Sequence, residues 1–403
     1  MAENIAVIDL WTDANRGDCA LQLGLIKMLK QKYPDAGIHG IFRFGYNEIS
    51  SALPETAYTR DELDFVYFAP RPTLYAGLNT KRNFWVRKLH SLLSFVIVIF
   101  YFLLHSFHLN FLLPVEVKRT FLILEEADVV YWKGKNFRDY PGFMGIQRQL
   151  TLLFAGYLTR LLCKKVQLVN ASVWSINNVF QKNMIKAAMA HCERITVRDK
   201  SSQVNLKQLG LESEYSRDLS FFEIYSHLPL ESVEKEFSIV LTVTKWGNEI
   251  QRKNYRSYLA SIINHKLATS ELYVAISPQV VREAENNNDE IEELLELIDD
   301  RNRVVVKTEV NDIRSLMKLY ASSQFLVGTR MHSCVFAASV GTPFLAIAYD
   351  SGPKWEVLYD FIECSSIKKM SELIPSSAID DLNNCKLKPF DMSNLSKLSQ
   401  ENV

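Results

Sequence analysis

The sequence predicts an α/β protein in which two doubly wound, Rossmann-like domains follow one another. Three observations support this prediction. Short apolar runs typical of buried parallel strands alternate with longer segments of helical periodicity along most of the chain. The alternation breaks once, at residues 226–235, and then resumes. The length of 403 residues is also sufficient for two domains with separate cores.

The composition argues against several classes of protein. Lys plus Arg and Asp plus Glu each number 46, so no net charge attracts nucleic acid. The six cysteines are scattered without a CxxC pair, which argues against a zinc ribbon or a disulfide scaffold. The N-terminal residues show no signal-peptide pattern, and no HExxH-type motif or histidine cluster occurs. We therefore expect a cytoplasmic protein with no nucleic-acid partner, no metal and no other cofactor.

The first domain is predicted to span residues 1–225. Its expected strands are Asn4–Trp11, Ile38–Phe44, Asp64–Phe68, Ala127–Trp132, Val166–Asn170 and Arg194–Arg198, and residues Asp218–Phe222 close the alternation. Its expected helices are Cys19–Tyr33, Gly145–Leu162, Met184–Ala190 and one that begins after residue 199 and ends at Leu209. Open α/β sheets bind ligands at the carboxyl ends of their strands, so the loops that follow these strands are the first candidates for function.

The loop after the first strand contains three residues suited to ligand binding, Asn15, Gly17 and Asp18. Gly17 permits a tight turn, and Asp18 is expected to cap the helix that follows. Capping alone and a direct role at the site weigh about equally for Asp18.

Residues 89–115 contain no Asp, Glu, Lys or Arg. A segment of this length qualifies as a transmembrane candidate. A true span, however, would place the strands of one domain on opposite sides of a membrane, and His105 and Asn110 interrupt its second half. We interpret residues at about 85–115 as an insertion that lies on one membrane leaflet, with the basic residues before it at anionic head groups. A helical hairpin buried in the core or in a dimer interface is the alternative.

The second domain is predicted at residues 236–390, followed by a C-terminal tail at 391–403. Its expected strands are Phe237–Thr244, Leu272–Ser277, Val304–Lys307, Gln324–Thr329 and Phe344–Tyr349. Its expected helices are Tyr255–Leu267, Glu283–Asp299, Asp312–Ala321 and Met331–Val340. The acidic run at residues 289–293 is expected to be a solvated helix face. Two such domains would face each other across a cleft lined by their strand ends.

The turn from the fourth strand of the second domain to its helix holds Arg330, Met331, His332 and Ser333. Backbone N–H groups at a helix start attract anions, and a guanidinium and an imidazole stand beside them here. The sequence therefore predicts an anion site. A histidine at a helix start is otherwise a cap or a packing residue.

These motifs resemble those of the polysaccharide pyruvyl transferase family. The matching pieces are residues 328–333 (GTRMHS), 341–343 (GTP), 348–350 (AYD) with Lys354, 15–20 (NRGDCA), 197–199 (VRD) with Ser201, and Asp218 with Phe221. The resemblance spans most of the chain and implies a fold similar to the type B glycosyltransferases. It implies transfer of a pyruvyl group from phosphoenolpyruvate, a co-substrate, to two hydroxyls of a sugar, forming a ketal. The acceptor would be a surface polysaccharide or its lipid-linked precursor.

The resemblance also implies that Arg198, Arg330 and His332 contact the donor, together with the backbone at Met331. Phosphoenolpyruvate carries a phosphate and a carboxylate, and guanidinium groups bind both bidentately. Ketal formation requires a proton delivered to the enol carbon and a proton removed from a sugar hydroxyl. We assign His332 as proton donor or partner of the phosphate charge, and Asp18 as base.

Two loops depart from the family pattern, at residues 132–136 and 171–175, where a glycine-rich turn and a glycine-proline pair are common. We expect Lys133 and Asn136 to contact the acceptor. Lys133 and Lys135 would either meet a phosphate of a lipid-linked sugar or be solvated. Lys245 is expected at the same site from the second domain, next to Trp246, which either stacks on a sugar or packs internally.

Two other functions fit the sequence. A nucleotide-sugar-dependent glycosyltransferase of the same fold would use Glu309 or Asp350 as its ribose-binding carboxylate. A non-catalytic, membrane-bound partner in polysaccharide assembly would need no catalytic residue. In each case the protein is expected to be peripheral on the inner face of the cell membrane, attached through residues 89–115.

Overall fold

The computed structural model describes residues 3–72, 84–163, 165–280, 287–308, 312–362 and 367–385. The chain divides into two compact units, of which the first contains Met1–Asp13 and Leu25–Arg217 and the second Ala14–Gly24 and Asp218–Val403. The division therefore falls inside helix α1 (Arg16–Lys32), whose first turns cluster with the second unit. The predicted tail at 391–403 lies outside the described residues.

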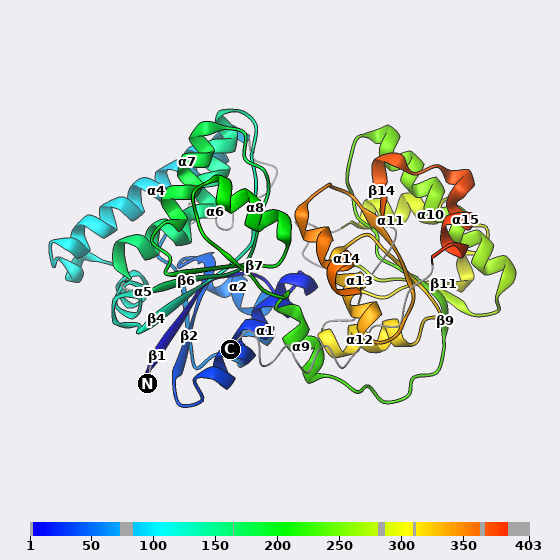
Figure 1. The fold of residues 1–403 in the computed structure, drawn as a ribbon, viewed down its shortest axis with the longest axis horizontal. Helices are drawn as coiled ribbons and strands as arrows, with labels where there is room; N and C mark the ends of the chain where they lie inside the picture. The colour runs from blue at the N-terminus through cyan, green and yellow to red at the C-terminus, as the bar shows by residue number, and fades with distance from the viewer. Residues whose placement is uncertain are drawn as a thin grey trace. The chain divides into compact units, whose positions relative to one another are not determined.

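The first unit is built on a parallel sheet with the strand order β3-β2-β1-β4-β6-β7-β8, in which β5 also pairs with β6 (Figure 1). The strands are β1 (Asn4–Leu10), β2 (Gly37–Gly45), β3 (Phe65–Ala69), β4 (Val129–Lys133), β5 (Asn136–Phe137), β6 (Val166–Val173), β7 (Arg194–Val197) and β8 (Glu214–Tyr215). The strand order reverses between β1 and β4, and such switch points are where open α/β sheets bind ligands.

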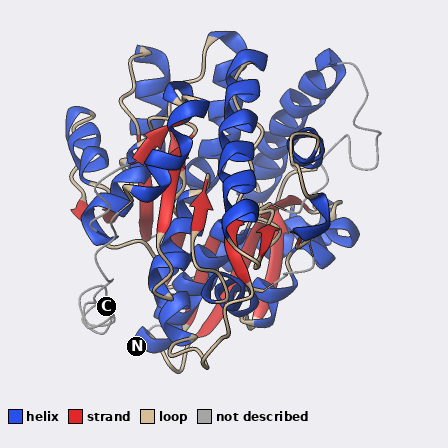
Figure 2. Cartoon of the chain, turned by 90° about the vertical axis from the view of Figure 1, so that its right-hand side faces the viewer, coloured by secondary structure: helices blue, strands red, loops and turns tan. Residues whose placement is uncertain are grey.

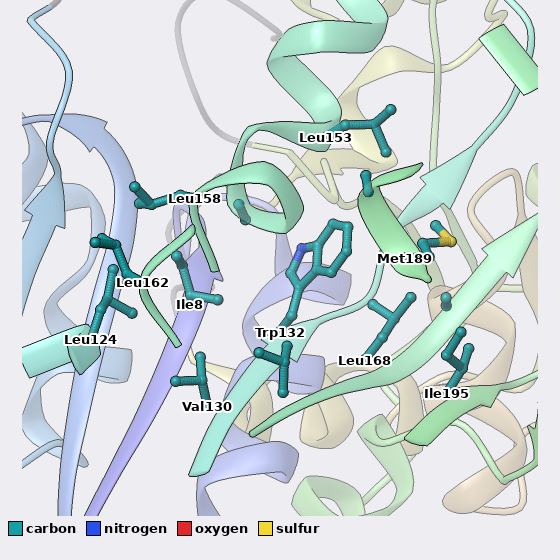
Figure 3. Packing of buried hydrophobic residues seen from close by; sticks show 14 of the residues in the cluster. Ile8, Leu124, Val130, Trp132, Leu153, Leu158, Leu162, Leu168, Met189 and Ile195 are labelled. Carbon is teal, nitrogen blue, oxygen red and sulfur yellow. The ribbon is translucent and has the colours of Figure 1, made fainter. Parts of the chain in front are cut away.

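The helices of the first unit are α1, α2 (Ile49–Glu55), α3 (Ala57–Asp61), α4 (Phe84–Ser106), the 3-10 helix η1 (Asn110–Leu112), α5 (Val115–Glu126), α6 (Gly142–Leu162), α7 (Val179–Met189) and α8 (Lys200–Gln208). The fully buried Trp132 lies in a core cluster to which α5, α6, α7 and α8 contribute buried side chains (Figure 3). Helix α6 lies so close to Trp132 that a Cβ added to Gly156 would be 2.5 Å from the ring. The switch-point strand β4 is thereby held from behind by tight packing.

The second unit has the strand order β11-β10-β9-β12-β13-β14, again with all pairings parallel. Figure 2 draws the strands red and the helices blue. The strands are β9 (Phe237–Leu241), β10 (Tyr273–Ile276), β11 (Val304–Val306), β12 (Leu326–Gly328), β13 (Phe344–Ala348) and β14 (Ile367–Lys369). The α-helices are α9 (Ser220–Ser226), α10 (Glu249–Thr269), α11 (Asn288–Leu295), α12 (Ile313–Ala321), α13 (Met331–Ser339), α14 (Glu356–Ile362) and α15 (Ala378–Asn383), and the short 3-10 helices are η3 (Arg301–Arg303), η4 (Pro353–Trp355), η5 (Met370–Glu372) and η6 (Pro375–Ser377).

Both faces of the second sheet are covered by helices. Ala275 of β10 belongs to the cluster that contains α12 and α13, whereas its neighbours Val274 and Ile276 belong to the cluster with α10 and α11. Successive residues of a strand point to opposite faces, so this division identifies a sheet buried on both sides. The predicted doubly wound α/β class is confirmed.

One predicted element is wrong. Residues Asp218–Phe222 do not continue the sheet, because α9 begins at Ser220 and the last strand of the first unit is β8. Asp218 Oδ1 accepts hydrogen bonds from the Ser220 N–H (3.0 Å) and hydroxyl (2.6 Å), and so stabilises a helix start.

The predicted apolar insertion forms α4, η1 and the start of α5. Within the described ranges, no helix has the combination of length and apolarity that a membrane crossing requires.

Candidate functional site

The connection from β12 to α13 consists of Thr329 and Arg330 alone. The Thr329 N–H donates to Thr242 Oγ1 (2.8 Å), and the Thr329 hydroxyl donates to the Thr242 carbonyl oxygen (2.5 Å). Because Thr242 follows β9, these bonds join the two strand ends at the switch point of the second sheet. Arg330 is thereby fixed as the N-cap residue of α13, with φ −124° and ψ 131°.

The Arg330 guanidinium is held without being neutralised. Its central carbon lies 5.4 Å from the centre of the Tyr349 ring, a cation–π distance. Its Nε is buried and has no hydrogen-bond partner among the described residues. An unbonded buried donor is unfavourable, by about 1–3 kcal/mol. A ligand with acceptor oxygens would remove this penalty.

The neighbours of Arg330 have structural partners. The Ser333 hydroxyl is buried and donates to the Arg330 carbonyl oxygen (2.6 Å), so it supports the turn. The Met331 side chain is buried in the core, which leaves its backbone N–H as the group at the helix start. Of these predicted contacts, Arg330 and His332 are therefore the two with side chains at the site.

The His332 ring is confined between a glycine and a carboxylate. A Cβ added to Gly17 would lie 2.3 Å from His332 Nδ1, so only glycine leaves room for the ring. His332 Nε2 lies 3.6 Å from Asp218 Oδ1, within ion-pair range but longer than a hydrogen bond. Gly17 lies inside α1, so the predicted tight turn is wrong, and its lack of a side chain instead leaves room for the imidazole.

Asp218 is the residue of this site to which the sequence interpretation gave no role. Its carboxylate is fully buried and also receives the two Ser220 hydrogen bonds described above. The available signal was its place in the family motif, before Phe221. Its proximity to His332 joins positions 114 residues apart in sequence, and no local pattern encodes such a contact.

The start of α1 differs from the prediction. The helix begins at Arg16, and Asn15 Oδ1 accepts the Asp18 N–H (3.4 Å). The expectation that Asp18 caps the helix is therefore wrong, because Asn15 occupies that place and Asp18 lies in the first turn. The Arg16 N–H donates to the Gln279 carbonyl oxygen (3.2 Å), which ties this helix start to the loop after β10.

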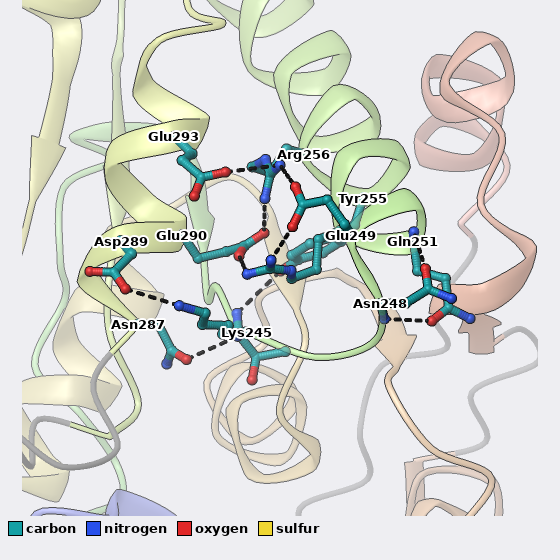
Figure 4. A network of polar contacts seen from close by, with 12 residues as sticks. Lys245, Asn248, Glu249, Gln251, Tyr255, Arg256, Asn287, Asp289, Glu290 and Glu293 are labelled. Atoms are coloured by element: carbon teal, nitrogen blue, oxygen red, sulfur yellow. Dashed lines mark hydrogen bonds and ion pairs between the residues drawn. The ribbon is translucent and has the colours of Figure 1, made fainter. Parts of the chain in front are cut away.

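Lys245, also predicted at the site, pairs with the acidic helix α11 (Figure 4). Its ammonium lies 2.9 Å from Asp289 Oδ2, and its backbone N–H donates to Asn287 Oδ1 at 2.9 Å. The hydrogen bond from Lys245 lowers the pKa of Asp289. Its partner is exposed, so Lys245 can still exchange it for a ligand oxygen.

The acidic run on α11 is only partly solvated, contrary to expectation. Glu290 is fully buried and pairs with Arg256 at 2.9 Å and Arg252 at 3.5 Å (Figure 4). Both arginines come from α10, which the sequence alone does not place beside α11. Burial raises the pKa of Glu290, against the lowering effect of Arg256.

Tyr349, whose ring faces Arg330, also packs against Trp246. The two ring centres are 5.0 Å apart, and Trp246 is 41% exposed. Asp350 accepts from Trp355 Nε1 (2.9 Å) and from the Lys354 ammonium (3.1 Å). The carboxylate that a nucleotide-sugar site would use is therefore already engaged. The other proposed carboxylate, at position 309, lies outside the described residues.

In the first unit, Arg198 is buried and bonded. Its Nε donates to Ser172 Oγ (2.9 Å) and one Nη donates to Asn136 Oδ1 (3.1 Å). The Ser172 hydroxyl donates to Asp199 Oδ2 (2.6 Å), and burial raises the pKa of Asp199. Asn136, predicted as an acceptor contact, holds Arg198 in place.

The switch point of the first sheet contains a buried ionic cluster around Asp9, which has a left-handed backbone (φ 75°). Asp9 pairs with Arg43 (2.8 Å) and with Lys135, and accepts from Trp132 Nε1 (3.1 Å). Burial would raise the pKa of Asp9, but the charges of Arg43 and Lys135 lower it to about 2. Burial and Arg43 lower the pKa of Lys135 to about 7. Lys133 is 2% exposed, and Lys135 is paired with Asp9. The alternative in which both lysines are solvated is therefore wrong.

Across the described ranges, no group of three or more His, Cys, Asp or Glu side chains has a metal-binding arrangement.

The family model for polysaccharide pyruvyl transferase matches residues 15–351 of this sequence. Among curated proteins, no match was found. The match includes Asn15, Gly17, Asp18, Arg198, Asp218, Arg330 and His332.

Several solved structures resemble this one at low sequence identity. The UDP-GlcNAc 2-epimerase of Neisseria meningitidis, bound to UDP-GlcNAc, has a TM-score of 0.57 and 10% identity, with 99% of each chain covered. The UDP-GlcNAc 2-epimerase of Methanocaldococcus jannaschii, in complex with UDP-GlcNAc and UDP, has a TM-score of 0.57 and 12% identity, with 99% of this chain and 98% of that chain covered. The UDP-N-acetylglucosamine 2-epimerase of Rickettsia bellii has a TM-score of 0.58 and 9% identity, with 100% of this chain and 95% of that chain covered. These likenesses show the fold, two parallel-sheet domains of the type B glycosyltransferase kind.

Proposed function

This chain belongs to the polysaccharide pyruvyl transferase family, and from that premise we propose that phosphoenolpyruvate is its donor and a pyruvate ketal its product. The acceptor is a sugar of a surface polysaccharide or of its lipid-linked precursor. The observation that carries the proposal is the guanidinium of Arg330, which is fixed at the start of α13 beside His332 and whose buried Nε has no hydrogen-bond partner among the described residues.

The reaction balances without a further reactant. The bond from the enol carbon C2 to the phosphate oxygen breaks, and two bonds from C2 to sugar oxygens form. One hydroxyl proton ends on the methylene carbon, which becomes a methyl group. The other leaves with inorganic phosphate. The enzyme must therefore deliver one proton, accept one proton and stabilise phosphate as it departs.

Arg330 and the backbone N–H groups at the start of α13 suit the charged end of the donor. Arg198 is the proposed second donor contact, and the hydrogen bonds that it donates to Ser172 and Asn136 orient its guanidinium. A preorganised arginine loses little conformational entropy on binding, which favours its use for a small dianion.

His332 is the proposed proton donor. A protonated imidazole would form an ion pair with Asp218 at the observed 3.6 Å, and Gly17 fixes the ring from the other side. Asp218 is then a positioning residue, and Asp18 in the first turn of α1 is the proposed base for the sugar hydroxyl.

For the acceptor, we propose Lys245 and the exposed ring of Trp246, with Lys133 as a further contact. Aromatic faces bind the apolar face of a sugar, and the Lys245 pair with Asp289 is exposed enough to exchange. A lipid-linked acceptor would be met at the inner face of the cell membrane, so the proposal includes peripheral attachment there.

The test is turnover of phosphoenolpyruvate by the purified protein with a lipid-linked or free oligosaccharide of its host. Release of inorganic phosphate, together with the mass increment of a pyruvate ketal on the glycan, is expected. If phosphoenolpyruvate neither binds in calorimetry nor is consumed with any glycan of the host, the proposed donor is wrong.

The similar solved structures named for UDP-GlcNAc motivate the one competing proposal, a nucleotide-sugar donor. Calorimetric binding of a uridine or guanosine diphosphate sugar without binding of phosphoenolpyruvate would favour it. A non-catalytic role predicts that the double variant Arg330→Ala, His332→Ala still supports normal glycan modification in the host.

A further inference from the structure

Over residues 93–106, where its side chains are described, helix α4 exposes most of its large apolar side chains and buries the polar Ser94 and His105. The inner face consists of Ser94, Val98, Tyr101 and His105, at intervals of four, three and four residues, and each is buried or half-buried. The outer face continues to the residue just past the helix and consists of Leu93, Val96, Phe100, Leu103 and Phe107, with exposed fractions from 46% to 70%. A surface helix in water has the opposite arrangement.

The inner face of α4 is firmly attached to the first unit. The Tyr101 and Tyr46 hydroxyls are 3.0 Å apart, and the Phe95 ring packs edge-on against Phe154 of α6. The His105 ring lies between Asn110 (2.7 Å) and Glu125 of α5 (2.8 Å). The exposed apolar face is therefore presented by a fixed helix, and rotation about its axis would break these contacts.

The apolar surface continues beyond α4 through the 3-10 helix η1 to the start of α5. Its most exposed member is Phe111, at 78%. We call this surface the α4 patch, and its exposed members are Leu93, Val96, Ile99, Phe100, Leu103, Phe107, Leu109, Phe111, Leu112 and Val115. Ten large apolar side chains in 23 residues exceed what a monomer exposes by chance and identify an interaction surface.

Two observations favour a lipid bilayer over a protein as the partner. Lys118 and Arg119 are exposed one turn after Val115, on the side of α5 that Val115 occupies, where anionic head groups would meet them. The two most exposed members of the patch, Phe107 and Phe111, lie together where α4 gives way to η1.

We propose that the α4 patch inserts into one leaflet of an anionic bilayer, with Lys118 and Arg119 at the head groups. This inference gives a surface to the membrane attachment included in the proposed function and does not depend on the transfer chemistry. The basic residues that precede the apolar segment have no described side chains, so their place at the head groups stays a prediction. Lys118 and Arg119 add cations that follow the segment.

The test is co-sedimentation of the full-length protein with vesicles of phosphatidylcholine, with and without phosphatidylglycerol. The wild type should bind the anionic vesicles more strongly. The double variant Phe107→Ser, Phe111→Ser should reduce the partition coefficient about tenfold or more, because each phenylalanine loses its apolar burial. Lys118→Gln with Arg119→Gln should reduce only the dependence on anionic lipid.

The matched control is Val179→Ser with Phe180→Ser on α7, two side chains that are 71% and 58% exposed but lie outside the patch. This control should bind vesicles like the wild type. Equal vesicle binding by the Phe107/Phe111 variant would overturn the proposal. So would a wild-type protein that ignores vesicles but forms a dimer which this variant abolishes, since the partner would then be a second copy.

Activity separates this inference from the proposed function. With a soluble acceptor fragment that lacks the lipid, the Phe107/Phe111 variant should transfer pyruvyl groups at the wild-type rate. Vesicle binding without any transfer by the wild type would leave the membrane surface in place and remove the proposed function.

Discussion

The two sheets share a strand order, yet the side chains at their carboxyl ends are chemically different. In the first unit the cations are bonded within the protein, Arg198 to Ser172 and Asn136, and Arg43 and Lys135 to Asp9. In the second unit, Arg330 has only the face of Tyr349 as a partner in the described part of the chain.

This difference indicates where a ligand must supply hydrogen-bond acceptors, namely at Arg330 in the second unit. Cations bonded internally are positioned before any ligand arrives, and removing one leaves its buried partners unsatisfied. An arginine whose donors are unused instead has its hydrogen bonds supplied by an anion. If this account is correct, substitutions in the first unit should affect stability and activity together, and substitutions at Arg330 should affect activity alone.

The largest effect is expected for Arg330→Ala. It removes the proposed contact to the departing phosphate, so kcat/KM for phosphoenolpyruvate should fall on the order of a thousandfold. Urea denaturation should show unchanged or slightly raised stability, because no internal hydrogen bond is lost. Arg198→Met should lower activity and also reduce the free energy of unfolding by about 1–3 kcal/mol, since Ser172 and Asn136 lose their partner. Equal stability losses in the two variants would contradict the comparison.

A smaller loss is expected for Gly17→Ala. The added methyl group would occupy the position of His332 Nδ1, so the ring must move. Steady-state turnover should fall on the order of a hundredfold, as for a displaced catalytic group. Gly37→Ala is the control, because its nearest neighbour would lie 3.5 Å away, an ordinary contact. Similar activity of the two variants would exclude the proposed confinement of His332.

Asp218→Asn should reduce kcat about tenfold and shift the pH dependence of kcat/KM, because the carboxylate that faces His332 loses its charge. Binding of phosphoenolpyruvate, measured by calorimetry, should change little. An unchanged pH profile with reduced stability would mean that Asp218 acts only through Ser220 at the start of α9.

The smallest effect concerns Lys135 and the pH dependence of stability. The pKa of Lys135 is about 7 in the folded protein against an ordinary 10.5, so between these values the unfolded chain binds its proton more often. The free energy of unfolding should therefore rise with pH, by at most about 1.4 kcal/mol per pH unit. Lys135→Met should remove this slope in urea denaturation between about pH 7 and about pH 9. Lys207→Met, at an exposed position, should retain it.

Much of this fold followed from the sequence, because apolar runs and helical periodicity are local. The strand before Arg330 and the helix after it were both predictable, whereas the anion site between them stays a prediction. The errors involve partners distant in sequence. Burial of Glu290 depends on arginines of α10, and the place of Gly17 depends on His332. Asp18 was expected to cap α1 because the helix start was placed three residues too late.

The division of the chain within α1 limits how the protein can be dissected. A fragment that begins at residue 218 would contain the whole second sheet but lack residues 14–24. Cys19, Ala20 and Leu23 belong to its core, and Gly17 supports His332. Such a fragment should be poorly folded and inactive on its own. A circularly permuted chain that keeps residues 14–24 attached should preserve the core packing and the support of His332, because the first turns of α1 belong to the second unit in all but sequence position.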